Sequence, residues 1–312
     1  MIRRIIEISS GPARLSVANR QLVIDRAEGG KAHVPCEDVG VLLVDHPAVT
    51  YTHGVFRTLL DTGAAVVLCG RDHHPSGLLL PVSGNTVQAE RYRLQIEAAK
   101  PLKKRLWQIV IKAKLRQQAT VLTHLVGKDA GLSAMAGRVH SGDPDNLEAR
   151  AAQRYWPRLF GTTFRRLRTG PPPNNLLNYG YTVLRAAMAR ALCAAGLLAT
   201  HGIHHHNRYN AFCLADDMME PYRPFVDLKI HRLVDDGYED SNIDRKAKTQ
   251  LLSLFNEGVE IGGQRTPLLL ALHATATSLN ASFAARRPGL DLPTGLPLAN
   301  LPEGDDGLPG KP

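Results

Sequence analysis

The sequence predicts an α+β protein: a small β-rich N-terminal domain, residues 1–84, followed by a larger all-α domain, residues 85–287. Three observations lead to this prediction. Up to about Ser83 the apolar residues form short β-rich runs separated by Gly, Asn and Asp. After Gly84 they recur at helical spacing. Residues 288–312 are rich in Pro and Gly, so we expect this tail to be disordered.

In the first part the β-rich runs are expected to form strands and one segment a helix. The segment over residues 52–63 shows helical spacing and is closed by Gly63. The expected strands are residues 2–9, 13–17, 20–25, 39–45 and 64–70.

The second part is expected to consist of helices. Asn85 or Thr86 is a suitable cap for a helix over 85–100, and Pro101 is well placed to open a long helix that reaches Leu125. Further helices are predicted at about 146–160, 175–197, 243–260 and 266–286.

Composition and charge narrow the class of protein. The 312 residues are 44% hydrophobic and 21% charged, as in ordinary globular proteins. The net charge of +9 favours a polyanionic partner, either nucleic acid or an anionic membrane surface. We expect no apolar run long enough to span a bilayer. Glu7 interrupts the apolar N-terminus, which therefore does not resemble a signal peptide. The four cysteines are far apart and show no CxxC pairing. We therefore expect a cytoplasmic protein with reduced thiols and no membrane association.

The stretch from Gly202 to Asp227 contains the first candidate site. His204 or His205, together with Asp217 and Glu220, offers one nitrogen and several carboxylate oxygens. Such a mixed set suits Mg²⁺ or Mn²⁺ better than zinc. In a helix, Asp217 and Glu220 would share one face. The alternative is a solvated histidine loop followed by a charged helix start.

A third carboxylate, Glu148, lies at the edge of an apolar helical stripe, with Arg150, Arg154 and Arg158 on an adjoining face. This pattern is typical of a carboxylate that binds a metal ion and is surrounded by arginines that contact phosphate. It is also typical of an ion pair on the surface.

Polar and basic residues form further candidate contacts with a bound partner. Asn178, Tyr179 and Tyr181 interrupt an apolar helix, which indicates either a polar contact with a ligand or a core helix whose hydroxyls are bonded. Two basic clusters are consistent with binding a phosphate backbone. They comprise Lys103, Lys104, Arg105, Lys112, Lys114 and Arg116, with Trp107 among them, and Arg165, Arg166 and Arg168.

Several catalytic motifs are absent from the sequence. It contains no GxGxxG after a strand, no GxxxxGK[ST], no GxSxG and no HExxH. An enzyme of this sequence would therefore take its nucleophile from water or from the substrate.

Three separated segments together resemble the CRISPR adaptation integrase, or "Cas-one", family. They are NLEARAAQRYWPRLFG, NNLLNYGYTVLRAAMARALCAAGL and HGIHHHNRYNAFCLADDMMEPYRPFVD. The earlier segment LLLPVSGNTVQAERYRLQIEAAKPLKKRLWQIVIKAKLRQQA resembles the type II (II-C-like) branch that accompanies Cas-nine effectors. The resemblance covers residues 2–287.

The resemblance implies a site for Mg²⁺ or Mn²⁺ held by Glu148, His205 and Glu220, with Asp217 a further acid of the cluster. His205 is chosen over His204 and His206 because the family's GI-x-H pattern ends there. Ala149 stands where the family often has glycine.

The resemblance also implies the function and the partners. The expected reaction joins the 3′-hydroxyl ends of short duplex DNA, the prespacer, to the CRISPR repeat. The implied partners are a second copy of the chain, a bridging "Cas-two" dimer and other type II proteins, including the Cas-nine effector. The rival interpretations are a metal-dependent nuclease or branched-DNA resolvase that uses water, and a non-catalytic DNA-binding scaffold. The expected DNA contacts are Arg150, Arg154, Asn178, Tyr179, Arg165, Arg166, Lys112 and Arg116.

Overall fold

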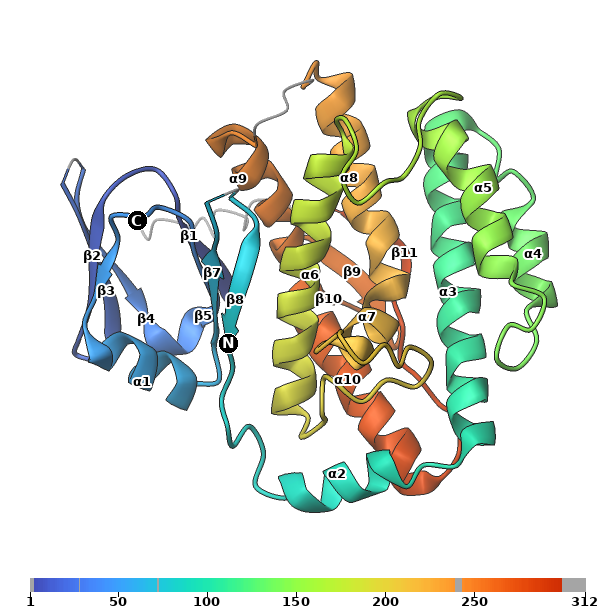
Figure 1. Ribbon diagram of the computed structural model, residues 1–312, viewed down its shortest axis with the longest axis horizontal. Helices are drawn as coiled ribbons and strands as arrows, with labels where there is room; N and C mark the ends of the chain where they lie inside the picture. The colour runs from blue at the N-terminus through green and yellow to red at the C-terminus, as the bar shows by residue number, and fades with distance from the viewer. Residues whose placement is uncertain (1–2, 28, 72, 239–242, 299–312) are drawn as a thin grey trace, which may run out of the picture.

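The computed structural model describes residues 3–27, 29–71, 73–238 and 243–298 and confirms the α+β class (Figure 1). Strands dominate the first part of the chain, and helices dominate the rest. The elements of the first part are β1 (Arg4–Ile8), β2 (Ala13–Ala18), β3 (Gln21–Arg26), β4 (Gly30–Pro35), η1 (Cys36–Asp38), β5 (Val39–Val44), β6 (Thr50–Tyr51), α1 (His53–Asp61), β7 (Ala65–Cys69) and β8 (Pro75–Leu79).

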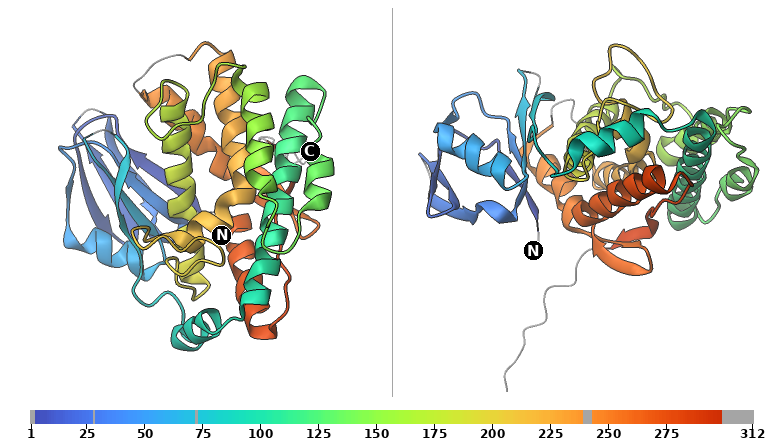
Figure 2. Two further views of the ribbon diagram at one scale, coloured as in Figure 1. Left: turned by 45° about the vertical axis from the view of Figure 1, so that its right-hand side comes forward. Right: turned by 90° about the horizontal axis from the view of Figure 1, so that it is seen from below.

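These strands form two four-stranded sheets, ordered β1-β5-β7-β8 and β4-β3-β2-β6. Strand β5 is buried at every position, as expected for the interior of a sheet covered on both faces. Its side chains alternate between two cores: Leu42 packs with the second sheet, whereas Leu43 packs with the helices. The first sheet therefore lies between the second sheet and the helical part (Figure 2).

Helix α6, most of whose residues are buried, lies between the first sheet and the other helices. In Figure 1 the helices α3, α6 and α8 run roughly along one direction, with α4 and α5 outside α3. The elements are α2 (Gln88–Ile96), α3 (Lys100–Val126), α4 (Leu132–Arg138), α5 (Leu147–Phe160), α6 (Asn174–Ala194), α7 (Cys213–Met219), η2 (Glu220–Tyr222), α8 (Arg223–Asp235), α9 (Arg245–Ser253), η3 (Leu254–Asn256), β9 (Gly258–Ile261), β10 (Gln264–Pro267), α10 (Leu268–Ala285) and β11 (Thr294–Leu298).

The structure corrects three expectations about these elements. The second part is not all-α, because β10-β9-β11 form a three-stranded sheet. The helix expected over 243–260 ends at Ser253, and Gly258 opens strand β9 instead. The start of the tail is ordered as β11, which pairs with β9; residues 299–312 lie outside the described residues. The boundary at residue 84 stays a prediction.

Strands β4, β6 and β8 were not expected from the sequence. β6 has two residues, and β8 contains Pro75 and Gly77, which oppose a strand prediction. β4 gains its structure by pairing with β3 along its whole length rather than from its own propensity.

Buried polar contacts join the first sheet to the helices. Lys248 of α9 forms a close ion pair with Asp45, which directly follows β5. Arg190 of α6 donates from Nε to the Gly63 carbonyl oxygen at 2.8 Å. These contacts fix the first sheet against α9 and α6 of the helical part.

Helix α10 corrects the expectation about apolar runs. By length and composition it is apolar enough to cross a membrane, but half of it is buried within the fold. Leu272, Leu279 and Phe283 belong to the main core, so this helix is a core element here. All four cysteines are free, as expected.

Candidate functional site

Glu148 and Glu220 lie 72 residues apart in the sequence but share one cation in the structure. Lys114 of α3 places its Nζ 2.6 Å from Glu148 Oε1 and 2.6 Å from Glu220 Oε2. Burial lowers the pKa of Lys114, but the two carboxylates outweigh this and raise it above its ordinary value. The lysine is therefore a charged ammonium between two acids.

The backbone around each glutamate is fixed locally. Asp143 accepts hydrogen bonds from the amides of Leu147 and Glu148 at 2.9 and 3.0 Å, which satisfies two free donors at the start of α5. Glu220 begins the 3₁₀ turn η2 between α7 and α8, and Arg223 Nε lies 3.0 Å from its Oε1. Burial opposes ionisation of Glu220, but Arg223 and Lys114 together hold its pKa below the usual range.

His205 is oriented by Asp217. Its Nδ1 lies 2.5 Å from Asp217 Oδ1, and this hydrogen bond raises the pKa of His205. Asp217 also accepts from the amides of Ile203, His204 and His205, which fixes the whole histidine loop on α7. Both Asp217 oxygens are therefore used, and the residue positions His205 instead of joining the acid pair.

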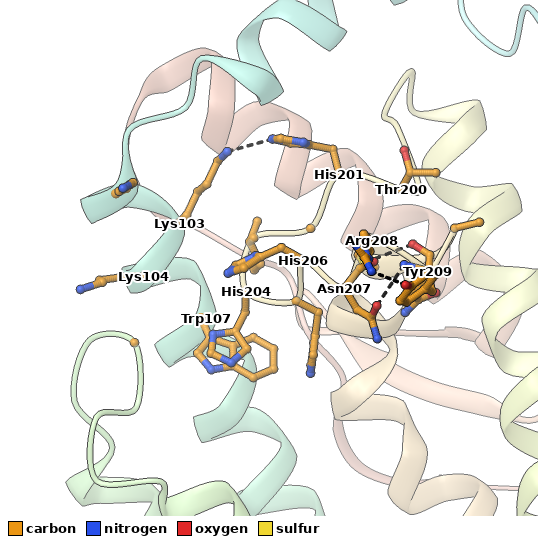
Figure 3. A pocket seen from close by; sticks show the side chains of 18 residues that line it. Lys103, Lys104, Trp107, Thr200, His201, His204, His206, Asn207, Arg208 and Tyr209 are labelled. Carbon is orange, nitrogen blue, oxygen red and sulfur yellow. Dashed lines mark hydrogen bonds between the residues drawn. The ribbon is translucent and has the colours of Figure 1, made fainter. Parts of the chain in front are cut away.

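The other two histidines of the triplet have different surroundings. His204 stacks on Trp107 of α3, with ring centroids 4.1 Å apart. Figure 3 shows His204 and His206 at a cavity of about 1000 Å³ that is also lined by lysines of α3. Lys103 Nζ lies 3.0 Å from His201 Nε2 across the rim of this cavity.

His205 is favoured over its two neighbours as the metal-binding histidine. Its Nδ1 is bonded to Asp217, which leaves Nε2 for another partner.

A network of buried hydrogen bonds joins α5, α6 and α8. Asp227 of α8 accepts a hydrogen bond from Tyr155 at 3.0 Å and a close one from Tyr181. Burial raises the pKa of Asp227 to about 7, although both hydroxyls favour its charged form. The Arg223 guanidinium lies over the Tyr181 ring at 4.7 Å. These contacts hold α5, which carries Glu148, to α6 and to α8, which directly follows the turn that carries Glu220.

The expected DNA contacts fall into two groups. Arg150, Arg154, Arg165 and Arg116 are exposed, and Lys112 is half-buried. Arg166 and Asn178 are instead used within the protein: Arg166 Nη2 donates to Asn178 Oδ1 at 2.8 Å, and Asn178 donates to the Arg168 carbonyl oxygen.

The structure corrects the expectation for Tyr179. The residue is completely buried, so it has no surface to offer to DNA. Tyr181 is also buried, so both tyrosines belong to the core. The expected hydroxyl hydrogen bond is present for Tyr181, which donates to Asp227, whereas the buried Tyr179 hydroxyl has no hydrogen bond of good geometry within the described residues.

Sequence reasoning missed the role of Lys114, which was grouped with the surface lysines of α3. The signal was present: Lys114 lies four residues after Val110 and four before Gln118, both buried, so a lysine interrupts the apolar face of the helix. Asp227 was also missed, because its partners Tyr155 and Tyr181 lie on other helices. Arg223 was missed although its partner Glu220 lies only three residues earlier.

The donor set fits a divalent metal ion once Lys114 moves. Among the residues that the structure describes, no three His, Cys, Asp or Glu side chains form a metal-binding cluster as they stand. Lys114 already occupies the place of a cation between two carboxylates, and Glu220 Oε2 is buried without a hydrogen bond of good geometry. Two carboxylates and an imidazole nitrogen suit Mg²⁺ or Mn²⁺.

Comparison with known proteins gives consistent matches over most of the chain. The family model "CRISPR associated protein Cas1" matches residues 6–253. The chain is 34% identical over 303 residues to the CRISPR-associated endonuclease Cas1 of Neisseria meningitidis serogroup C (strain 8013), covering 96% of this chain and 98% of that protein.

Solved structures share the fold at low sequence identity. A casposase bound to an integration product has a TM-score of 0.76 and 18% identity over 92% of each chain. A chain of a Cas6-RT-Cas1–Cas2 complex has a TM-score of 0.72 and 17% identity, covering 92% of this chain and 36% of that one.

Proposed function

The chain belongs to the CRISPR-associated Cas1 family, and we propose that it is a divalent-metal-dependent integrase that joins prespacer DNA to the CRISPR repeat. One observation carries this proposal. Glu148 and Glu220, from separate segments, share the Lys114 ammonium, and His205 lines a cavity together with lysines of α3. The hydrogen bond to Asp217 chiefly raises the pKa of His205, and the charges of Glu220 and Glu148 raise it further.

The proposed reaction is a transesterification. The 3′-hydroxyl oxygen of the incoming strand bonds to a phosphorus of the repeat and gives up its proton. The bond from that phosphorus to its own 3′ oxygen breaks, and the leaving oxygen takes up a proton. When bound, Mg²⁺ or Mn²⁺ would stabilise the charge that develops on the phosphoryl oxygens and favour ionisation of the attacking hydroxyl.

The chain's own residues prepare this site. Glu148 and Glu220 would supply the carboxylates that hold the ion, and Arg223 keeps Glu220 ionised and oriented. Asp217 fixes the ring of His205 so that Nε2 is available to the ion. Lys100, Lys103 and Lys104 line the adjacent cavity, where they would neutralise the phosphates of a DNA strand that enters it.

Two solved relatives bear on the proposed partners. One similar structure is a casposase bound to an integration product, and another contains Cas2. We therefore propose that this chain also binds DNA and a small Cas2 dimer, and that it acts as a homodimer.

Strand transfer tests the proposal directly. The protein, with and without its Cas2 partner, is incubated with labelled short duplex and a plasmid that carries the repeat. The proposal requires covalent joining that depends on Mg²⁺ or Mn²⁺ and stops with EDTA. If metal-dependent hydrolytic nicks accumulate without joined product, the nuclease interpretation is the correct one. If DNA is bound but neither reaction occurs, the chain is a scaffold.

DNA binding is expected to be electrostatic and to tolerate changes of sequence. Reversing the charge of the exposed cavity residues Lys100, Lys104 and Arg208 should weaken binding of unrelated duplexes by at least about 100-fold at 0.1 M salt. The slope of log affinity against log salt should fall by about 0.9 for each phosphate that the protein no longer neutralises. Fluorescence anisotropy at several salt concentrations measures both quantities.

Two other sets of variants locate the path of the DNA. Reversing Arg165 and Arg168, or Lys112 and Arg116, should weaken binding to a smaller degree, because these residues lie outside the cavity lining. The matched control reverses Arg14 and Arg57, which are exposed on the first part of the chain. An equal loss in this control would attribute the effect to net charge and contradict a local DNA site.

The homodimer is expected to form through the N-terminal sheets. The β4 edge carries Lys31 and Pro35, which oppose strand pairing, whereas β6 at the other edge presents the exposed ring of Tyr51 against Phe56. Light scattering at micromolar concentration should give twice the 34.1 kDa of one chain. Tyr51→Lys should raise the dimer dissociation constant by at least about ten-fold.

Val82→Lys is the matched control, because Val82 is also a large exposed apolar residue but lies outside both sheets. A strictly monomeric wild-type chain would contradict the dimer. An unchanged dimer in Tyr51→Lys would exclude the β6 edge as the interface.

A further inference from the structure

Lys114 holds a position that a metal ion would need. Its Nζ reaches one oxygen of Glu148 and one of Glu220 at the same distance, 2.6 Å. The side chain is 12% exposed, and Glu220 is almost completely buried. Within the described part of the chain, the polar contacts of this ammonium are the two acids themselves.

Two acids so close together need a positive charge between them. Without one, two like charges would face each other in a site that is poorly solvated, which costs free energy. A lysine ammonium is a compact charge on a flexible four-carbon stem, so it can satisfy both acids and still withdraw.

Arg223 contacts the same cluster in a different way. Its Nε lies at the other oxygen of Glu220, and its guanidinium is held over the Tyr181 ring. This second anchor keeps Arg223 in place and lets it orient Glu220. The Lys114 ammonium has no comparable second contact within the described residues and is carried by a flexible side chain. Lys114 is therefore the cation that can move away from the acids.

We propose that Lys114 is a resident counter-ion of the Glu148–Glu220 pair and that a divalent metal ion takes its place when it binds. This inference rests on the proposed function, because it takes these two acids to be metal ligands. Metal binding is then an exchange of cations. In the metal-free protein the ammonium lies between the two acids, and the ion must displace it to bind.

Lys114→Met tests the exchange, because methionine keeps the unbranched stem and removes the charge. Without the competing ammonium, the variant should bind Mn²⁺ at least about ten-fold more tightly than wild type at about pH 8. Its metal-free form should melt at a lower temperature, and Mn²⁺ should raise its Tm by more than it raises that of wild type. Electron paramagnetic resonance of free Mn²⁺ and thermal melts measure these quantities.

Lys248→Met is the matched control. Lys248 is also a buried lysine paired with a carboxylate, Asp45, but it lies outside the site. This variant should melt at a lower temperature and bind Mn²⁺ as wild type does. An affinity of Lys114→Met equal to or weaker than that of wild type would overturn the exchange.

A measurement on the wild-type protein decides the question if Lys114→Met does not fold. An amine acetylating reagent is applied briefly with and without Mn²⁺, and labelled peptides are quantified by mass spectrometry. Mn²⁺ should increase labelling of Lys114 several-fold and leave the buried Lys248 unchanged. Equal labelling of Lys114 under both conditions would overturn the proposal.

Glu148→Gln and Glu220→Gln separate this inference from the proposed function. If both variants lose Mn²⁺ binding while Lys114→Met binds as wild type does, the metal site stands and the exchange fails. If both variants bind Mn²⁺ as tightly as wild type, the proposed metal site itself is wrong, and the exchange fails with it.

Discussion

Glu220→Ala is expected to abolish metal-dependent strand transfer, lowering its rate by about a thousand-fold or more. The ion that Glu220 would help to hold contributes several kcal/mol of transition-state stabilisation, and each 1.36 kcal/mol corresponds to a factor of ten. Glu148→Ala and His205→Ala should have effects of similar size. Because the three act on one ion, the double variant of Glu148 and Glu220 should be little worse than either single variant. Single-turnover joining of labelled duplex to repeat DNA measures the rates.

Glu257→Ala is the matched control for Glu220→Ala. Glu257 is also a buried glutamate with a lysine partner, Lys229, 2.6 Å away, but it lies outside the site. Breaking either buried pair should cost about 3–5 kcal/mol of unfolding free energy. Loss of strand transfer only in the Glu220 variant would separate chemistry from stability. Near wild-type transfer by folded Glu148→Ala or Glu220→Ala, with normal metal dependence, would contradict the site assignment.

The sequence predicted the elements whose own pattern determines them. The β-rich runs between Gly, Asn and Asp and the apolar period after Gly84 were sufficient for β5, α3, α5 and α6. Strands such as β4, which depend on a neighbouring strand for their hydrogen bonds, were missed. The helix over 243–260 was overextended because the apolar residues around β9 are also compatible with helical spacing.

Contacts between side chains of different helices were the least predictable part of the site. Spacing and resemblance indicated Glu148, His205 and Glu220, but not the lysine between the two acids. Lys114 comes from α3, 34 residues before Glu148, and its sequence neighbours Lys112 and Arg116 indicate a solvated basic face. Tyr179 was misjudged for a similar reason: a polar residue in an apolar helix indicates a ligand or a buried partner equally well.

The nucleophile separates an integrase from a hydrolase, so removing the 3′-hydroxyls of the prespacer should stop the reaction completely. A hydrolase needs a group that deprotonates water. Lys114 is already an ammonium, and His205, bonded to Asp217 through Nδ1, would use Nε2 for the ion. A strand transferase needs only a hydroxyl delivered to the ion, and the cavity of about 1000 Å³ beside the site can admit the end of a DNA strand.

Duplexes with 3′-hydroxyl and 3′-deoxy ends, otherwise identical, are therefore compared in Mg²⁺ and in Mn²⁺. The hydroxyl duplex should become covalently joined to repeat DNA, whereas the deoxy duplex should bind with the same affinity and give no joined product. The reverse reaction should release the duplex from branched DNA, because transesterification replaces one phosphodiester by another at little net change in free energy. If deoxy ends leave product formation unchanged and the products are hydrolytic nicks, water is the nucleophile. The three proposed ligands would then serve an endonuclease, and the integrase proposal for this chain would fail.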